Sequence, residues 1–257
     1  MENQVQTTVQ DRRGAGAFRT TARVVGVIYL AGMVVGVVGN LLIQSILAAP
    51  DQLATFGAST MLVAVGALLW LMAVAGDAAH GILMFPVLRR HSERIAFGYF
   101  GTRIMDAVFV AVMALLILVQ IPLGREYLRA GASDTSSLLA LSAVLTQAQL
   151  YAYHFGMLTV GFAGLMLCYL FYRARLVPRP LAIWGLVGYA IILCGSVLEV
   201  LGFNLRAIHT IPGGLWEVFI GVWLIVKGFS SSPLASEPTT SLTTPLVPSP
   251  AAGSATA

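Results

Sequence analysis

The chain has 257 residues, of which 58% are hydrophobic and only 10% are charged. Soluble globular domains carry about 25% charged residues on average, so this composition excludes an ordinary water-soluble protein. The net charge is +4, but the arginines stand in short clusters between apolar runs, so nucleic acid is not an expected partner. The composition predicts an integral membrane protein whose main partner is the lipid bilayer.

Residues 1–22 are polar and lack the apolar core of a secretory signal peptide, so we expect them to form a disordered cytoplasmic tail. The first apolar run, residues 24–48, is long enough to cross about 30 Å of hydrocarbon as a helix. An Ala-Ala pair precedes Pro50, which leaves a cleaved signal peptide as an alternative interpretation of this run.

Five more apolar runs follow in the chain, at residues 61–88, 95–121, 148–172, 181–203 and 213–227. Each is continuously apolar instead of alternating with a period of two, so helices are expected in place of β-barrel strands. The sequence therefore predicts an all-α fold, a polytopic transmembrane helical bundle of about six spans within residues 23–229.

Helix-breaking prolines stand at the boundaries of these runs, at Pro122, Pro178, Pro180 and Pro212. The longest predicted loop is residues 123–147, and its second half, 136–147, is expected to extend the fourth helix outward. Residues 230–257 are rich in Ser, Thr, Pro and Ala and have almost no charge, which predicts a disordered C-terminal tail.

Basic residues are distributed unequally between the two sides of this predicted bundle. Eleven of the 15 Lys and Arg residues fall on the side of both termini, and three, Arg125, Arg129 and Arg206, fall on the other side. Cytoplasmic loops of membrane proteins are enriched in Lys and Arg, so both termini are predicted to be cytoplasmic. The remaining basic residue, Arg103, falls inside the third predicted span.

Six ionisable residues fall well inside the predicted spans, namely Asp77, Arg103, Asp106, His154, Glu199 and Glu217. A charged side chain at the centre of a membrane helix costs about 2.5 to 3.5 kcal/mol on insertion scales, so such residues are expected to face the bundle interior. We therefore interpret these six residues as a buried polar cluster and a candidate ligand-binding site.

Three of the acids are predicted to lie at a similar depth. From the helical rise per residue, Asp77, Asp106 and Glu217 lie roughly 15 to 18 Å from the cytoplasmic helix ends, near the bilayer midplane. Arg103 shares a helical face with Asp106 and is expected to pair with Asp106, Asp77 or Glu217.

The four acids of this cluster outnumber its one arginine, and its histidine is expected to be neutral. Four carboxylates cannot all stay ionised in an interior of low dielectric, so protons or a cation must balance the excess charge. Our leading hypothesis is a buried acidic site that binds a small polar or cationic ligand, or a proton, in transport or sensing. Six spans without an inverted repeat are few for a monomeric transporter, so transport would favour a homo-oligomer.

Two other hypotheses stay open at this point. A static polar network could fix the helix register of a structural or regulatory partner protein. A membrane-embedded enzyme would use Asp77 with His154 and Glu199, the last two nearer the outer surface, for acid–base or metal chemistry. His80 and His209 add ligand types, but no H-E-x-x-H, Walker A or G-x-S-x-G motif is present, so no metal or cofactor is predicted.

A stripe of small and amide residues marks the first predicted span, where Gly32, Gly36, Asn40 and Gln44 recur every four positions. Small residues at this spacing allow helix backbones to approach closely. We expect this face to pack against protein, with the two amides hydrogen-bonded there.

Several short segments also resemble one family of bacterial membrane proteins. They are Ala-Arg-Val-Val-Gly-Val-Ile-Tyr-Leu at residues 22–30, Asp77, Arg103 with Asp106, His154-Phe155-Gly156, residues 172–180, and Glu217 with Trp-Leu-Ile-Val-Lys-Gly at residues 223–228. On these residues the chain resembles the family called domain of unknown function 4386. The resemblance implies a helical bundle in the bacterial cytoplasmic (inner) membrane and adds no reaction mechanism.

Reporter fusions test the predicted topology. Fusions after Arg94, Arg179 and Ser230 should report the cytoplasm, and fusions within residues 123–135 should report the opposite side, because basic loops are retained in the cytoplasm. Alkaline phosphatase and a fluorescent protein, fused at the same sites, give opposite signals and control for each other. A periplasmic signal after Arg94 would contradict the six-span arrangement.

Overall fold

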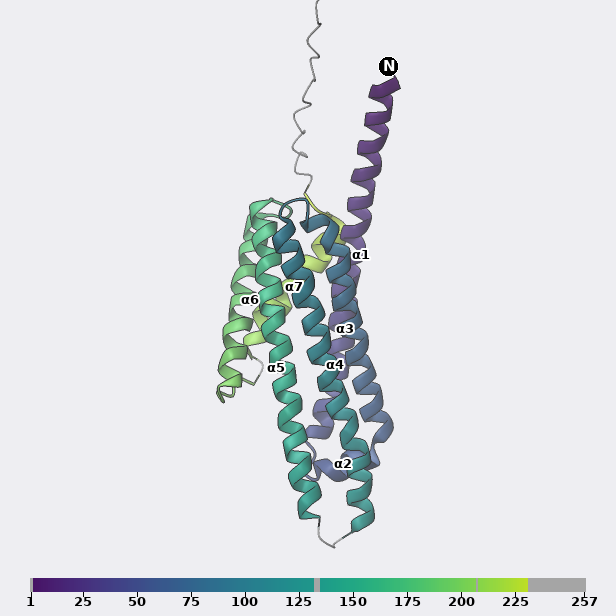
Figure 1. Ribbon diagram of the computed structural model, residues 1–257, viewed down its shortest axis with the longest axis vertical. Helices are drawn as coiled ribbons and strands as arrows, with labels where there is room; N and C mark the ends of the chain where they lie inside the picture. The colour runs from purple at the N-terminus through teal and green to yellow at the C-terminus, as the bar shows by residue number, and fades with distance from the viewer. Residues whose placement is uncertain (1, 132–134, 207, 231–257) are drawn as a thin grey trace, which may run out of the picture.

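Residues 2–131, 135–206 and 208–230 are described by the structure, a computed structural model (Figure 1). Within these ranges every regular element is a helix, and six helices are long and apolar enough to cross a membrane. These findings confirm the predicted all-α polytopic bundle.

The helices follow the predicted apolar runs. In chain order they are α1 (Glu2–Leu47), α2 (Gln52–Ala58), α3 (Thr60–Leu88), α4 (Glu93–Ala130), α5 (Ser136–Arg173), α6 (Arg179–Val200), the 3-10 helix η1 (Ile208–Thr210) and α7 (Ile211–Val226). The short helix α2 was not predicted from the sequence. Asp51 caps it by accepting a hydrogen bond from the backbone N–H of Ala54 at 3.0 Å.

One of the proline predictions is wrong. Pro122 lies inside α4, which continues to Ala130. A proline inside a helix removes one backbone hydrogen bond and crowds the preceding turn, but membrane helices tolerate it where neighbouring groups compensate. Pro180 and Pro212 lie in the first turns of α6 and α7, as predicted, because the N–H groups there have no partner within the helix.

The ends of the predicted spans are placed as follows. α1 begins at Glu2, so residues 2–22 continue the first helix. We predicted a disordered tail for residues 1–22. No proline interrupts this segment. α5 begins at Ser136, which confirms the outward extension of the fourth predicted span. The predicted C-terminal tail lies outside the described residues, except for Ser230, whose backbone N–H donates to the Leu176 carbonyl oxygen at 2.8 Å.

The six long helices form a ring in chain order. α1 packs on α3, and each following helix packs on the next, until α7 packs back on α1 and closes the ring. α2 packs against α4 at the end of the bundle opposite the N-terminus, where α4 and α5 reach well beyond the end of α6 (Figure 1). Such a ring encloses an interior lined by one face of every long helix.

Glycine pairs allow helix backbones to meet at several of these contacts. The pairs are Gly26 with Gly221, Gly39 with Gly66, Gly57 with Gly124, and Gly188 with Gly213. A side-chain carbon built on Gly26 would lie 2.5 Å from the Gly221 carbonyl oxygen, which is closer than non-bonded atoms approach. The contact between the first and last helices therefore requires glycine at this position.

Two apolar clusters fill the interior, and a polar layer separates them. In α4 one cluster reaches as far as Tyr99 and the other begins at Val110, with Arg103 between them. α3 is divided in the same way, with Val74 in one cluster and Met84 in the other. The buried charged residues of these two helices thus lie in a single layer between two apolar cores.

Alanine substitutions in α1 test the glycine contact that closes the ring. Gly26→Ala should destabilise the protein by about 1 to 3 kcal/mol, because the added methyl group forces α1 and α7 apart. Gly32→Ala on the same helix is the matched control, since a side-chain carbon there would meet nothing within 4 Å. Thermal unfolding in detergent measures both variants. Equal melting temperatures for the two variants would contradict this account of the contact.

Candidate functional site

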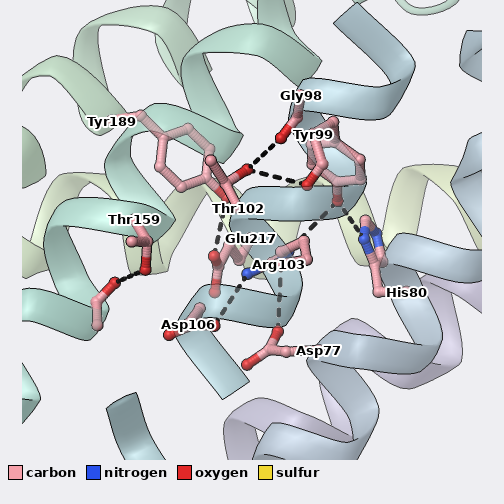
Figure 2. A network of polar contacts seen from close by, with 11 residues as sticks. Asp77, His80, Gly98, Tyr99, Thr102, Arg103, Asp106, Thr159, Tyr189 and Glu217 are labelled. Atoms are coloured by element: carbon pink, nitrogen blue, oxygen red, sulfur yellow. Dashed lines mark hydrogen bonds and ion pairs between the residues drawn. The ribbon is translucent and has the colours of Figure 1, made fainter. Parts of the chain in front are cut away.

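Arg103 is the centre of the polar layer (Figure 2). Its side chain is only 4% exposed, and its guanidinium group reaches two carboxyl groups. One nitrogen lies 3.2 Å from Asp77 Oδ1 on α3, and the other lies 3.7 Å from Asp106 Oδ2, one turn further along α4. A buried guanidinium is stable only when acids compensate its charge, so these three residues form one electrostatic unit.

Two glycines make room for this unit. A side-chain carbon built on Gly81 of α3 would lie 3.1 Å from Arg103 Cβ, and one built on Gly156 of α5 would lie 3.3 Å from Asp106 Oδ1. Both separations are tighter than ordinary van der Waals contact. The neighbouring helices therefore approach Arg103 and Asp106 closely, and the Asp106 side chain is only 1% exposed.

A tyrosine and a histidine extend the network to one side of Arg103. The Arg103 Nε–H donates to the Tyr99 hydroxyl oxygen at 3.4 Å, and the same hydroxyl group is hydrogen-bonded to His80 Nδ1 (Figure 2). Tyr99 lies four residues before Arg103, and His80 lies three residues after Asp77, so each shares a helical face with its charged neighbour. This spacing is the signal that could have added both residues to the predicted site.

Glu217 enters the layer from α7 without an ion-pair contact to Arg103 in the described part of the chain. It accepts a hydrogen bond from the Tyr189 hydroxyl group of α6 at 2.8 Å. The Tyr189 ring fits against the backbone of Gly164 on α5, where a side-chain carbon would overlap it. Of the three acids predicted as possible partners of Arg103, Glu217 contacts a tyrosine instead. The sequence did not indicate this contact because Tyr189 lies on another helix.

A pocket of about 120 Å³ adjoins this layer. Its lining includes Tyr29, Gly32 and Gly36 of α1, Asp77 and His80 of α3, and Glu217 of α7. The Asp77 side chain is 38% exposed, in contrast to the sealed Asp106. Arg103 therefore lies between a carboxyl group that faces the pocket and one that is closed off from it.

The prediction for the stripe on α1 is correct only in that Gly32 and Gly36 face the interior. The expected close approach of another helix is absent at Gly32, where an added side-chain carbon would meet nothing within 4 Å. Gly32 and Gly36 face the interior, where their missing side chains leave space for the pocket. Asn40 and Gln44 are exposed on the outside of the bundle, so the prediction that they face protein is wrong. Four residues advance a helix by about 40° beyond a full turn, so a stripe at this spacing drifts off the packing face within three steps.

The other two candidates, His154 and Glu199, form a separate pair. His154 Nε2 lies 3.7 Å from Glu199 Oε2, and Glu199 Oε1 accepts a hydrogen bond from the backbone N–H of Leu205 at 2.7 Å. Among the described residues, no hydrogen bond or ion pair joins this pair to Arg103, and no three His, Cys, Asp or Glu side chains could together hold a metal ion. The six predicted residues thus divide into a four-residue polar layer and an outer pair.

Replacing the buried arginine tests the electrostatic unit. Arg103→Leu should destabilise the protein by about 3 to 5 kcal/mol, because it leaves buried acids without their cation. Arg129→Leu is the matched control: Arg129 also pairs with an acid three residues away on α4, but its side chain is 73% exposed. That exposed pair is worth about 0 to 1 kcal/mol.

Thermal unfolding in detergent measures the two leucine variants side by side. Adding Asp106→Leu to Arg103→Leu should recover part of the lost stability, because one stranded charge is removed with its partner. Similar losses for Arg103→Leu and Arg129→Leu would show that the Arg103 pairs do not support the fold.

Comparisons with known proteins agree with the resemblance noted in the sequence. A family model described as Domain of unknown function (DUF4386) matches residues 24–228, which include every residue of the polar layer. No curated protein and no solved structure matches the chain. Since the family model covers most of the chain, this integral membrane protein belongs to the DUF4386 family.

Proposed function

We propose that this protein binds a small cation, or protons in its place, at the pocket between α1, α3 and α7. The observation that carries the proposal is that Asp77 and Glu217, from helices that are not neighbours in the ring, line the same pocket of about 120 Å³. Two acids from separate helices meet at low dielectric only where something positive compensates them. A bound cation or protons supply that compensation.

The charges of the layer support this reading. The layer contains three carboxyl groups, of Asp77, Asp106 and Glu217, and Arg103 is the one Lys or Arg that contacts any of them within the described residues. Arg103 is already shared between two aspartates. Among the residues that the structure describes, Glu217 has only the neutral Tyr189 as its partner, so its charge is the one left for a ligand.

The two halves of the layer have different roles in this proposal. Arg103 and Asp106 are sealed between closely packed helices and hold the bundle in register, which is the role of a static polar network. Asp77 and Glu217 face the pocket and bind. Binding of a cation inside a membrane bundle serves transport or sensing, and transport by six spans favours assembly of two or more copies.

Cation-dependent unfolding tests the proposal. Ammonium and methylammonium chloride should raise the melting temperature of the protein in detergent in a saturable manner, because a ligand that binds only the folded state stabilises it. Tetraethylammonium chloride, which is too large for the pocket, controls for ionic strength. Asp77→Asn and Glu217→Gln should each reduce the shift, and Glu126→Gln should leave it unchanged because that side chain is 59% exposed near Arg129.

A second set of variants tests the pocket without changing its acids. Gly32→Leu should remove the cation-dependent shift, because leucine fills the space beside Tyr29 and Asp77. Gly101→Leu on α4 is the matched control, since a side-chain carbon there also meets nothing within 4 Å and the position is exposed. If the cation-dependent shift in melting temperature persists in Gly32→Leu, or never saturates in the unmodified protein, a static polar network explains the acids better than cation binding does.

A further inference from the structure

Two buried hydrogen-bonding groups in the pocket are not used by the rest of the protein. They are the Tyr29 hydroxyl group and His80 Nε2, and neither has a hydrogen-bond partner among the described residues. Tyr29 is 7% exposed and His80 is 1% exposed, and both line the pocket. Burying a polar group without a partner destabilises the folded protein, so a ligand that bonds to these groups removes that cost.

The hydrogen bonds from Arg103 through Tyr99 to His80 determine which imidazole nitrogen carries the proton. Arginine can only donate, so the Tyr99 oxygen accepts from Arg103 Nε–H. The Tyr99 proton then has one acceptor among its contacts, namely His80 Nδ1. The neutral imidazole therefore carries its own proton on Nε2. His80 presents a hydrogen-bond donor to the pocket, and Tyr29 can donate beside it.

The carboxyl groups present acceptors to the same pocket. Asp77 uses Oδ1 for Arg103, and Glu217 uses Oε1 for Tyr189. The second oxygen of each carboxyl group has no ion pair or hydrogen bond in the described part of the chain. A ligand that satisfies the whole lining must therefore carry a cationic donor for the two acids and an acceptor for the histidine.

The volume of the pocket limits the size of this ligand. A cavity of about 150 Å³ holds benzene, with six heavy atoms, so a pocket of about 120 Å³ holds roughly four or five. The Trp70 ring also lines the pocket, and an aromatic face attracts an ammonium group. A cation such as guanidinium fits the volume but offers no acceptor to His80.

We propose that the pocket takes a 2-aminoethanol unit, with its ammonium group between Asp77 and Glu217 and its oxygen accepting from His80 Nε2–H. This inference rests on the proposed cation-binding function and names the class of ligand. The same unit occurs in a free amino alcohol and in an ethanolamine lipid headgroup, so the chemistry of the lining fits both sources.

Three soluble probes of nearly equal size test two claims separately: that the pocket binds a cation, and that it also recognises an oxygen. Ethanolamine carries both groups, ethylamine lacks the oxygen, and ethylene glycol lacks the ammonium group. From the dependence of melting temperature on concentration, ethanolamine should bind about three- to tenfold tighter than ethylamine, which is the effect of one added hydrogen bond. Ethylene glycol should give no saturable shift. An ethanolamine phospholipid, compared with a phosphatidylglycerol of the same chains, tests the lipid source.

Variants identify the group that recognises the oxygen. His80→Phe should bring ethanolamine down to the affinity of ethylamine while the ethylamine shift remains. Tyr99→Phe is the second variant in case His80→Phe does not fold; it frees the imidazole to place its proton on either nitrogen and should reduce the same preference. Nitrogen chemical shifts of His80 in labelled protein should show the proton on Nε2 in the unmodified protein.

The outcomes decide whether the pocket binds a cation and whether it recognises an amino alcohol. Equal stabilisation by ethanolamine and ethylamine would overturn the amino-alcohol inference and leave cation binding standing. No stabilisation by either amine or by the ethanolamine lipid would overturn the amino-alcohol inference, and a further lack of stabilisation by ammonium and methylammonium would overturn cation binding as well. Stabilisation by the lipid alone would support the inference and assign the lipid headgroup as the source. A proton on His80 Nδ1 would overturn the assigned donor and with it the inference.

Discussion

The fold depends on a buried arginine. Arg103 is held in an apolar interior by Asp77 on the neighbouring helix and Asp106 on its own helix. This pairing stabilises the ionised form of either acid, since an unpaired charge in the membrane interior is costly. The polar layer therefore has a fixed position along α3 and α4, and the two apolar clusters are the cores that form on either side of it.

Glycine shapes both the ring and the space inside it. Where two glycines meet, as at Gly26 and Gly221, the backbones touch and the ring closes. Where glycine faces the interior without a partner, as at Gly32, the result is empty space beside the acids. The same residue type thus provides a close helix contact of α1 and, less than two turns away on that helix, part of the space of the pocket.

The spans could be predicted because continuous hydrophobicity is a one-dimensional signal that requires no knowledge of neighbours. The pairing of Arg103 with Asp106 could also be predicted from local sequence, since both residues lie on one face of one helix. The tyrosine contact of Glu217 and the separate pairing of His154 with Glu199 could not, because they depend on how each helix is rotated about its axis. Pro122 shows the corresponding limit of local rules, as α4 continues through it.

The order of the helices around the ring has a consequence for how the protein is made. Chains emerge from the ribosome starting at the N-terminus, so Asp77 enters the membrane before Arg103, and Asp106 follows directly. The α3 and α4 hairpin then holds Arg103 together with both of its aspartates before the later helices arrive. Glu217 comes with the last helix, and its partner Tyr189 comes with the helix just before it. The pocket is therefore completed only at the step when α7 meets α1 and closes the ring.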